Sequence, residues 1–307
     1  MRITLKHLEY FVATAEAGSI KLAAEKISIS APSISSAIAH LEAELRVQLF
    51  IRRHAQGLTL TPAGKRIARD SKLVLRQAEA LYSVAGELRD SITGRLSIGC
   101  MVTLAPMIIP ELSHAFTSTY PEVKLAIVEN THEQLIEQLR QANVDAAISY
   151  DLGFSDDITF EPLASLPPQV ILASDHPLSK RKRIKLSDLA GLPMILLDLP
   201  YSRQYFLSLF QNEDRMPYIY ARSAHQEVVR AMVSNGFGFA ISNVRPRNLT
   251  TLDGRELVAL DLVGQHQPMT IGLATLHQEY KPLLLETFEK HCRELISKRA
   301  IPGMVNV

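Results

Sequence analysis

Residues 19–45 read SIKLAAEKISISAPSISSAIAHLEAEL, and this stretch decides the fold of the first part of the chain. Apolar residues recur there at helical spacing twice, first at Ile20, Ala23, Ala24 and Ile27 and then at Ile34, Ile38, Leu41 and Leu45. A short Ser-rich segment separates the two stripes. Two short helices joined in this way are typical of a helix-turn-helix, which places its second helix in the major groove of DNA. An ordinary helical hairpin has the same spacing.

The start of the second helix carries the residues that would face DNA. Ser30 is placed to cap this helix, and Pro32 falls in its first turn, where a missing N–H costs little. The face opposite the apolar stripe holds short polar side chains that can approach base edges. We therefore expect DNA contacts from Ser30, Pro32, Ser33, Ser35, Ser36 and His40.

The flanking sequence supports a DNA-binding module. Leu5, Leu8, Phe11, Val12 and Ala15 predict a preceding amphipathic helix that completes a three-helix core. Residues 49–64, LFIRRHAQGLTLTPAG, predict a two-stranded wing that turns at a glycine. A basic and polar cluster at the tip of the wing is consistent with an ordinary solvent-exposed loop. Because it follows a candidate recognition helix, it also suits contacts with DNA phosphates or the minor groove. The residues of this cluster are Arg52, Arg53, His54 and Gln56.

A long helix is predicted after Pro62. Ile67, Val74, Leu81 and Leu88 recur every seven residues, and smaller residues follow four positions after most of them. We expect this seam to form a coiled coil between two copies of the chain, although a helix packed on its own domain is the alternative. Pairing two copies presents two recognition helices to two half-sites, so the operator should have dyad symmetry.

The remainder of the chain alternates strand and helix patterns. Strands are predicted at 95–100, 123–129, 145–150, 170–173, 194–197, 237–242 and 269–275, with helices near 106–119 and from Thr131. Helices between strands favour parallel, doubly wound sheets, which bind ligands at the carboxyl ends of their strands. The fold class is therefore an N-terminal winged helix-turn-helix, a linker helix and an α/β domain.

Several motifs resemble those of the LysR-type transcriptional regulators. They are LxxLxYFVAxAExGS at 5–19, AAEK at 23–26, PSIS at 32–35, LExELxVxLFxR at 41–52 and LTPAG at 60–64. The resemblance implies a periplasmic-binding-protein-like effector domain of two subdomains, and dimers that commonly assemble into tetramers. The expected division is 1–61 for the DNA-binding domain, 62–93 for the linker helix, 94–301 for the effector domain and 302–307 for a tail. Subdomain I then holds 94–163 and 268–301, and subdomain II holds 164–267.

The same resemblance suggests where an effector binds. In this family, small hydroxyl residues after the first strand, at the second helix start and in the second subdomain contact the effector, and Thr103, Thr131 and Ser202 match them. Tyr150, His225 and Gln226 are further candidates. Thr131 also forms a capping box with Gln134, so helix capping is the alternative role. Hydroxyls and helix starts favour a small anion or carboxylate as the effector, without a metal or other cofactor.

One departure from the family pattern affects base recognition. The family usually carries Gln just before the proline of the recognition helix and Arg just after the second serine, but this chain has Ala31 and Ser36. Two side chains capable of bidentate base contacts are therefore missing. A coiled-coil interaction protein with weakened base readout is an alternative function for such a chain.

Composition sets further bounds on function. Residues 1–93 hold 13 Lys and Arg against 9 Asp and Glu, so the basic excess coincides with the helix-turn-helix. Cys100 and Cys292 form no CxxC pair, which suits a reducing cytoplasm, and a redox sensor using Cys100 is an alternative. Nucleophile-elbow, zinc-protease and P-loop motifs are absent from the sequence, so we do not expect an enzyme. No segment is apolar enough to predict a membrane span. Expected partners are operator DNA and, for an activator, RNA polymerase.

Overall fold

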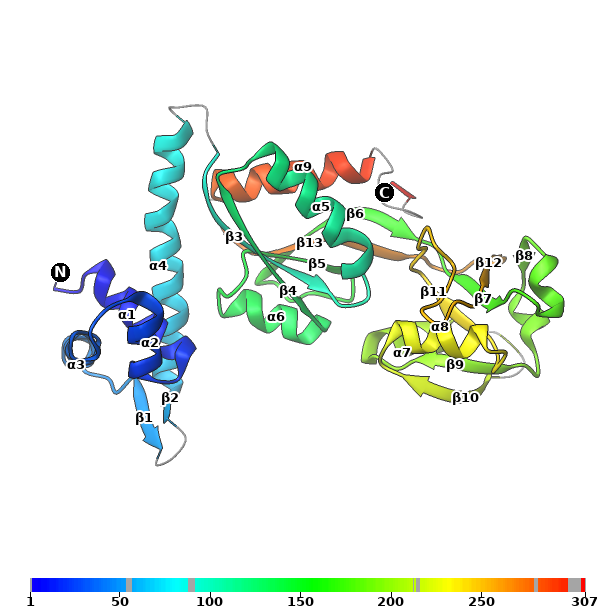
Figure 1. The fold of residues 1–307 in the computed structure, drawn as a ribbon, viewed down its shortest axis with the longest axis horizontal. Coiled ribbons are helices and arrows are strands. Elements are labelled where there is room, and N and C mark those ends of the chain that lie inside the picture. Colours follow the sequence, from blue (N-terminus) through cyan, green and yellow to red (C-terminus); the bar gives the residue numbers. More distant parts are fainter. Residues whose placement is uncertain are drawn as a thin grey trace.

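The computed structural model describes residues 2–53, 57–87, 92–211, 213, 216–278, 281–297 and 305–306. Figure 1 shows three parts in a row: a helical module that includes the N-terminus, a central sheet unit and a second sheet unit at the far end. The N-terminal module comprises residues 2–60. The first sheet unit comprises 94–166 with 269–306, and the second comprises 169–262.

The N-terminal module is a winged helix-turn-helix, as the sequence predicts. Its helices are α1 (Leu5–Ala17), α2 (Ile20–Ile27) and α3 (Ala31–Leu45), and its antiparallel wing strands are β1 (Phe50–Arg53) and β2 (Gly57–Leu60). Phe11, Ile34, Leu41 and Leu49 are fully buried at its centre. Burial of these apolar side chains is the main force that holds the helices together.

Polar contacts orient the wing against the helices. The Glu42 carboxylate accepts hydrogen bonds from the backbone N–H groups of Leu49, at 2.7 Å, and Phe50, at 3.4 Å. The Leu58 N–H donates to the Gly18 carbonyl at 2.8 Å. Glu42 therefore connects the recognition helix to β1, while Leu58 ties β2 to the α1–α2 turn.

The long helix α4 (Pro62–Glu87) packs on the N-terminal module and also contacts the first sheet unit. Ile67 is half-buried against the module core and Ser71 is 3% exposed. The first turns of the predicted seam therefore pack within their own chain. Val74 and Leu81 are 43% and 70% exposed. Leu88 lies outside the described residues. The start of α4 therefore packs on its own module, and Val74 and Leu81 stay exposed within one chain although α4 also contacts the first sheet unit.

The first sheet unit is a six-stranded sheet covered on both faces (Figure 1). Its strand order is β14-β6-β13-β5-β3-β4. The strands and helices are β3 (Gly94–Met101), α5 (Ala105–Thr119), β4 (Val123–Asn130), α6 (His132–Arg140), β5 (Ala146–Tyr150), β6 (Ile158–Leu166), β13 (Met269–Leu276), α9 (Leu283–Ser297) and β14 (Val305–Asn306). Helices α5 and α9 cover one face and α6 covers the other.

The second sheet unit has a four-stranded sheet, β11-β7-β12-β8, and a two-stranded sheet, β10-β9. Its elements are β7 (Gln169–Ala173), the 3₁₀ turns η1 (Pro177–Lys180) and η2 (Leu186–Leu189), β8 (Arg183–Ile184), β9 (Pro193–Leu197), α7 (Pro200–Ser208), β10 (Tyr218–Ser223), α8 (Gln226–Ser234), β11 (Ala240–Ser242) and β12 (Leu257–Leu262). Helix α8 packs on β7 and β9. Its core is separate from that of the first sheet unit.

The structure corrects three details of the sequence interpretation. The sheets are mixed rather than purely parallel, because β13 runs antiparallel to both β5 and β6. Strand β6 continues to Leu166, so the chain crosses between sheets at Pro167 and Pro168 rather than near Leu163. The expected tail contributes β14, which pairs with β6. These pairings join segments distant in sequence, so local patterns do not reveal them.

Gly64→Ala should destabilise the N-terminal module by about 1–3 kcal/mol, the usual cost of overpacking. A Cβ at Gly64 would lie 2.1 Å from the Leu49 carbonyl oxygen, which belongs to the backbone and cannot rotate away. The measurement is denaturant unfolding of the full chain followed by circular dichroism. Lys65→Ala, at the exposed neighbouring position, is the control. Equal stability of Gly64→Ala and wild type would show that this close approach does not constrain the module.

Candidate functional site

The recognition helix α3 presents a polar face on the surface of the N-terminal module. Pro32, Ser33 and Ser36 are exposed, and Ser35 and His40 are half-buried. The exposed Ser30 caps the helix, because its hydroxyl accepts the Ser33 N–H at 3.3 Å. The Ser30 and Ser33 hydroxyls also lie 2.7 Å apart. These two residues therefore present a shared pair of hydroxyls at the start of the helix that enters a groove in proteins of this fold.

Two of the four predicted DNA-contact residues of the wing lie within the described part of the chain. Arg52 and Arg53 lie on β1, next to the turn that joins it to β2. His54 and Gln56 lie outside the described residues. The DNA contacts expected from the basic cluster at the wing tip therefore stay a prediction.

Three chain segments meet where the two sheet units join. Asn243, which is 2% exposed, donates through Nδ2 to the Leu166 carbonyl at 2.8 Å and to the Tyr205 hydroxyl at 3.2 Å. Tyr205 in turn donates to the Gln267 carbonyl at 2.8 Å. Since Leu166 and Gln267 precede and follow the second sheet unit, these bonds fasten both crossings to each other.

A hollow of about 480 Å³ opens beside this junction. In the first sheet unit, the hollow is lined by Thr103, which precedes α5, and by Met107 and Glu111 of α5. In the second sheet unit, it is lined by His225, Gln226, Glu227 and Arg247. Apolar groups such as Pro106 and Val244 supply much of the remaining wall. The hollow is thus formed by both sheet units, and Glu111 and Arg247 approach to 3.5 Å across it.

Thr103 connects the hollow to the interior of the first sheet unit. Its side chain is 6% exposed, and its hydroxyl donates to the Tyr150 hydroxyl at 3.5 Å. Tyr150 is 3% exposed, and burial raises its pKa, partly opposed by the hydrogen bond from Thr103. Tyr150 is therefore a neutral phenol behind Thr103 and does not line the hollow itself.

A ring contact also joins the two sheet units. His132 at the start of α6 lies 4.9 Å from Tyr201 of α7, measured between ring centroids, and its Nδ1 is 3.2 Å from the Ser149 hydroxyl. Burial lowers the pKa of His132, which favours the neutral imidazole. Thr131, whose N–H donates to Gln134 at 3.1 Å, caps α6 as its capping-box pattern predicts. The ring contact links the two sheet units away from the hollow.

The structure therefore brings only part of the predicted effector set together. Thr103, His225 and Gln226 line one hollow, and Tyr150 supports Thr103. Thr131 and the buried Ser202 do not line it. Sequence patterns missed Glu111, Arg247 and His132, because each acts through a partner on a distant segment. Only the capping sequence around Thr131 pointed towards the start of α6.

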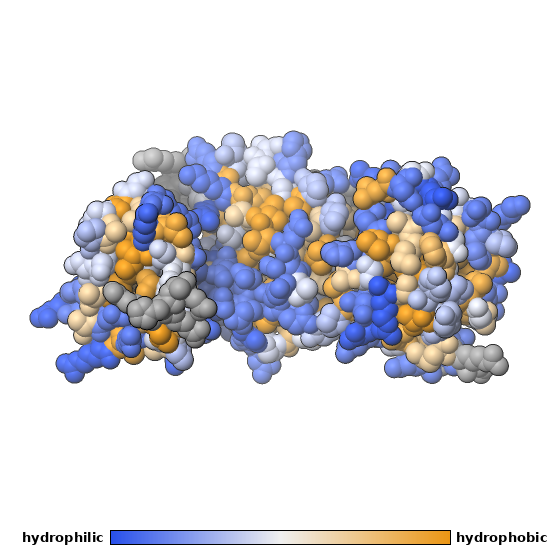
Figure 2. Space-filling view, turned by 60° about the horizontal axis from the view of Figure 1, so that its bottom comes forward, coloured by the Kyte–Doolittle hydropathy of each residue, from blue (hydrophilic) through white to orange (hydrophobic). Residues whose placement is uncertain are grey.

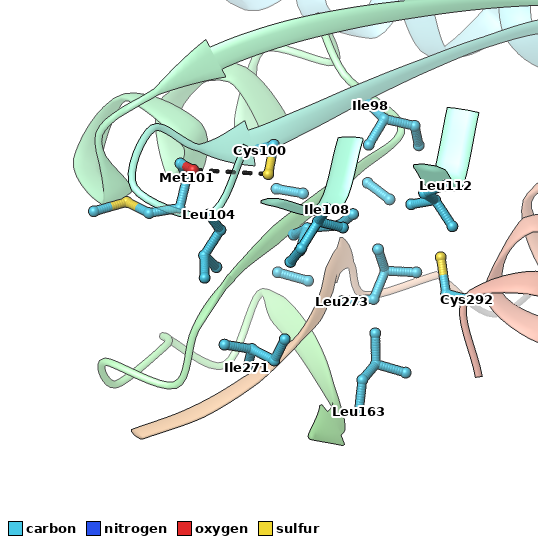
Figure 3. Packing of buried hydrophobic residues seen from close by; sticks show 14 of the residues in the cluster. Ile98, Cys100, Met101, Leu104, Ile108, Leu112, Leu163, Ile271, Leu273 and Cys292 are labelled. Carbon is cyan, nitrogen blue, oxygen red and sulfur yellow. Dashed lines mark hydrogen bonds between the residues drawn. The ribbon is translucent and has the colours of Figure 1, made fainter. Parts of the chain in front are cut away.

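Both cysteines lie in the core of the first sheet unit. Cys100 is 0% exposed and Cys292 is 1% exposed, and Figure 3 shows their sulfur atoms among aliphatic side chains such as Ile108 and Leu112. The Cys100 thiol donates a weak hydrogen bond to the Met101 carbonyl at 3.7 Å. Burial raises the pKa of both thiols, and nearby carboxylates add to the effect. The reactive thiolate form is therefore strongly disfavoured at both positions.

Within the described ranges, no three His, Cys, Asp or Glu side chains are arranged to hold a metal ion. Among the helices that the structure describes, none has the length and apolarity to cross a bilayer.

Family models match both halves of the chain. Residues 5–65 match the bacterial regulatory helix-turn-helix protein model of the lysR family, and residues 89–297 match the LysR substrate binding domain. A similar curated protein is the hydrogen peroxide-inducible genes activator of Pectobacterium carotovorum subsp. carotovorum. It is 28% identical over 240 residues, which cover 78% of this chain and 79% of that protein.

Solved structures agree with this match. HinK, a LysR family transcriptional regulator from Pseudomonas aeruginosa, superposes with a TM-score of 0.65 and 35% identity, covering 96% of this chain and 99% of that one. Full-length CbnR, solved in complex with its target DNA, shares the fold with a TM-score of 0.63 at 21% identity, covering 95% and 99% of the two chains. This chain belongs to the LysR family of DNA-binding transcriptional regulators and is not an enzyme.

Proposed function

We propose that this regulator responds to a small molecule that binds in the hollow between its two sheet units. The observation that carries the proposal is the position of Thr103, His225 and Gln226, which face one cavity from opposite sides of the junction. A ligand there contacts both units at once. It therefore favours one relative arrangement of the units over another by its difference in affinity, which is the requirement for allosteric coupling.

The chemistry of the hollow favours an organic carboxylate. Helix α8 begins at its wall, and its first turn has no side-chain cap, so the backbone N–H groups at that helix start are available to an anion. Arg247 adds a guanidinium. Pro106, Met107 and Val244 offer apolar surface to the rest of the ligand. Glu111 and Glu227 disfavour a large multiply charged anion, so a small carboxylate with an apolar body fits best.

Genome-wide mapping of bound DNA tests the regulatory function directly. Sites upstream of genes, with dyad-symmetric half-sites, are expected. Genes next to these sites then indicate which carboxylates to assay for a shift in melting temperature. Binding scattered without sequence preference would instead support an interaction protein with weak base readout.

We infer that the exposed part of α4 pairs two chains. Val74 and Leu81 follow heptad spacing and are uncovered in one chain, whereas Ile67 is occupied by its own module. Figure 2 shows separate apolar patches on a largely hydrophilic face. Higher assembly into a tetramer is part of the same proposal.

Peroxide sensing is the alternative that one relative suggests, because the Pectobacterium protein is named as a hydrogen peroxide-inducible genes activator. Burial of Cys100 and Cys292 disfavours the same chemistry in this chain. The proposal is therefore a ligand-responsive rather than a thiol-based regulator. It acts on operator DNA in the cytoplasm, with RNA polymerase as the partner where it activates transcription.

Thr103→Val should abolish or strongly weaken the response to the carboxylate that stabilises the wild-type chain. Valine keeps the volume at the wall of the hollow but removes the Thr103 hydroxyl and its hydrogen bond to Tyr150. The measurement is ligand-dependent expression from a mapped promoter, with operator binding measured in parallel. Thr117→Val on the same helix is the control, since that hydroxyl bonds only to α5 backbone carbonyls. Unchanged response in Thr103→Val would place the effector elsewhere.

Leu81→Asp should shift the chain towards monomers and weaken operator binding at least tenfold, because a buried unpaired carboxylate opposes the seam. Analytical ultracentrifugation and fluorescence anisotropy measure the two effects. Leu252→Asp is the matched control, since Leu252 is 90% exposed and lies outside α4. A dimer that persists in Leu81→Asp would remove the coiled-coil assignment.

Both thiols should resist labelling by a water-soluble disulfide reagent in the native chain and react fully after denaturation. Their burial blocks access, and the raised pKa suppresses the thiolate. Absorbance of the released chromophore measures the reaction. Rapid native labelling that disappears in Cys100→Ser would restore the redox alternative.

A further inference from the structure

A second hollow, of about 680 Å³, lies on the N-terminal module between the first turns of α1 and the recognition helix. Lys6 and Tyr10 line it from α1, and Ser33, Ser36 and His40 line it from α3. None of the described residues that line it is acidic. The hollow is therefore polar and basic, and it opens on the polar face of α3.

Several hydrogen-bond donors in this hollow lack a protein partner. Lys6 is exposed, and within the described part of the chain neither its ammonium, the Tyr10 hydroxyl nor the Ser36 hydroxyl makes a hydrogen bond or ion pair. Ser33 differs, since its hydroxyl is bonded to Ser30. Tyr10 is half-buried against the module core, so its ring is held in place while its hydroxyl remains available.

The rim of the hollow is fixed by histidine. The His40 Nε2–H donates to the Arg2 carbonyl at 3.3 Å, and the rings of His7 and His40 lie 4.8 Å apart between centroids. These contacts hold the segment before α1 against α3. Lys6 and Ser36 consequently approach the same space from two helices whose relative position is set before DNA arrives.

We propose that this hollow binds a phosphate of the DNA backbone, with Lys6 and Tyr10 of α1 and Ser36 of α3 as donors. The proposal rests on DNA binding by the module and adds a contact outside the recognition helix and the wing. Phosphate oxygens accept hydrogen bonds from lysine, tyrosine and serine side chains, and such contacts fix the register of a protein on the duplex without reading sequence. Because Ser36 is short, it leaves the hollow open. Helix α1 then supplies the cation that α3 lacks at this position.

Lys6→Gln in the full-length protein tests the proposal. Affinity for a duplex carrying a mapped operator and for a random-sequence duplex of equal length is measured by fluorescence anisotropy at several salt concentrations. The affinity falls as salt concentration rises. Loss of one phosphate contact makes this negative slope of log affinity against log salt concentration shallower by about 0.9 for each DNA-binding module bound. Affinity should fall about tenfold at low salt, as for one charge-assisted hydrogen bond, and by a similar factor on both duplexes.

Two further variants distinguish a phosphate contact in this hollow from a general effect of charge on affinity. Tyr10→Phe should weaken both duplexes alike without changing the salt slope, because it removes a neutral donor. Lys124→Gln, which removes an exposed lysine from β4, should leave affinity and slope unchanged. Unchanged binding by Lys6→Gln, or a loss confined to the operator duplex, would overturn the phosphate site. Failure of the wild-type chain to bind either duplex would instead overturn DNA binding itself.

Discussion

The buried amide of Asn243 is the constraint on which the arrangement of the two sheet units depends. It joins the Leu166 carbonyl to the Tyr205 hydroxyl, and Tyr205 continues the chain of hydrogen bonds to Gln267. Burial raises the pKa of Tyr205, so the phenol keeps its proton and remains a donor. Hydrogen bonds shielded from water are expensive to break. This network therefore sets where the two sheet units meet, and with it the hollow that both of them line.

The linker helix α4 contacts both the N-terminal module and the first sheet unit. Arg76 of α4 pairs with Asp145 at 2.6 Å and donates to the Ala142 carbonyl, also at 2.6 Å. Burial raises the pKa of Asp145, while the Arg76 guanidinium opposes that shift. One turn earlier, Lys72 pairs with Glu16 of α1 at 3.3 Å and donates to Asn143. Helix α4 is thus bonded both to α1 and to the loop before β5.

The N-terminal module was predictable because its contacts are short in sequence. The stripe that includes Ile34 and Leu41, the Ser30 cap and the glycine at the end of the wing turn all act within a few residues, and local patterns report such features well. The role of Glu42 was not predictable in the same way. Its carboxylate caps the N–H groups of a strand that follows the helix, which a helical pattern does not reveal.

Less of the two sheet units than of the N-terminal module could be predicted from the sequence. Buried strands such as β5 and β7 are visible as apolar runs, whereas β6 contains Glu161 and Pro162 and was missed. Only some of the predicted effector residues line the hollow, because their positions also depend on contacts between distant segments. Thr103 and His225 can be placed at element ends from local sequence, but whether they share a cavity depends on how the chain crosses between sheets.

The sequence by itself determined the helix-turn-helix, the wing, the long helix and the family resemblance, since these follow from periodicity and motifs within single segments. The tertiary structure decided which of the effector candidates line one hollow, that both thiols are buried and that α1 shares a second hollow with α3. Those outcomes depend on contacts between distant segments. Their free energy comes from burial and from hydrogen bonds made only after the chain has folded.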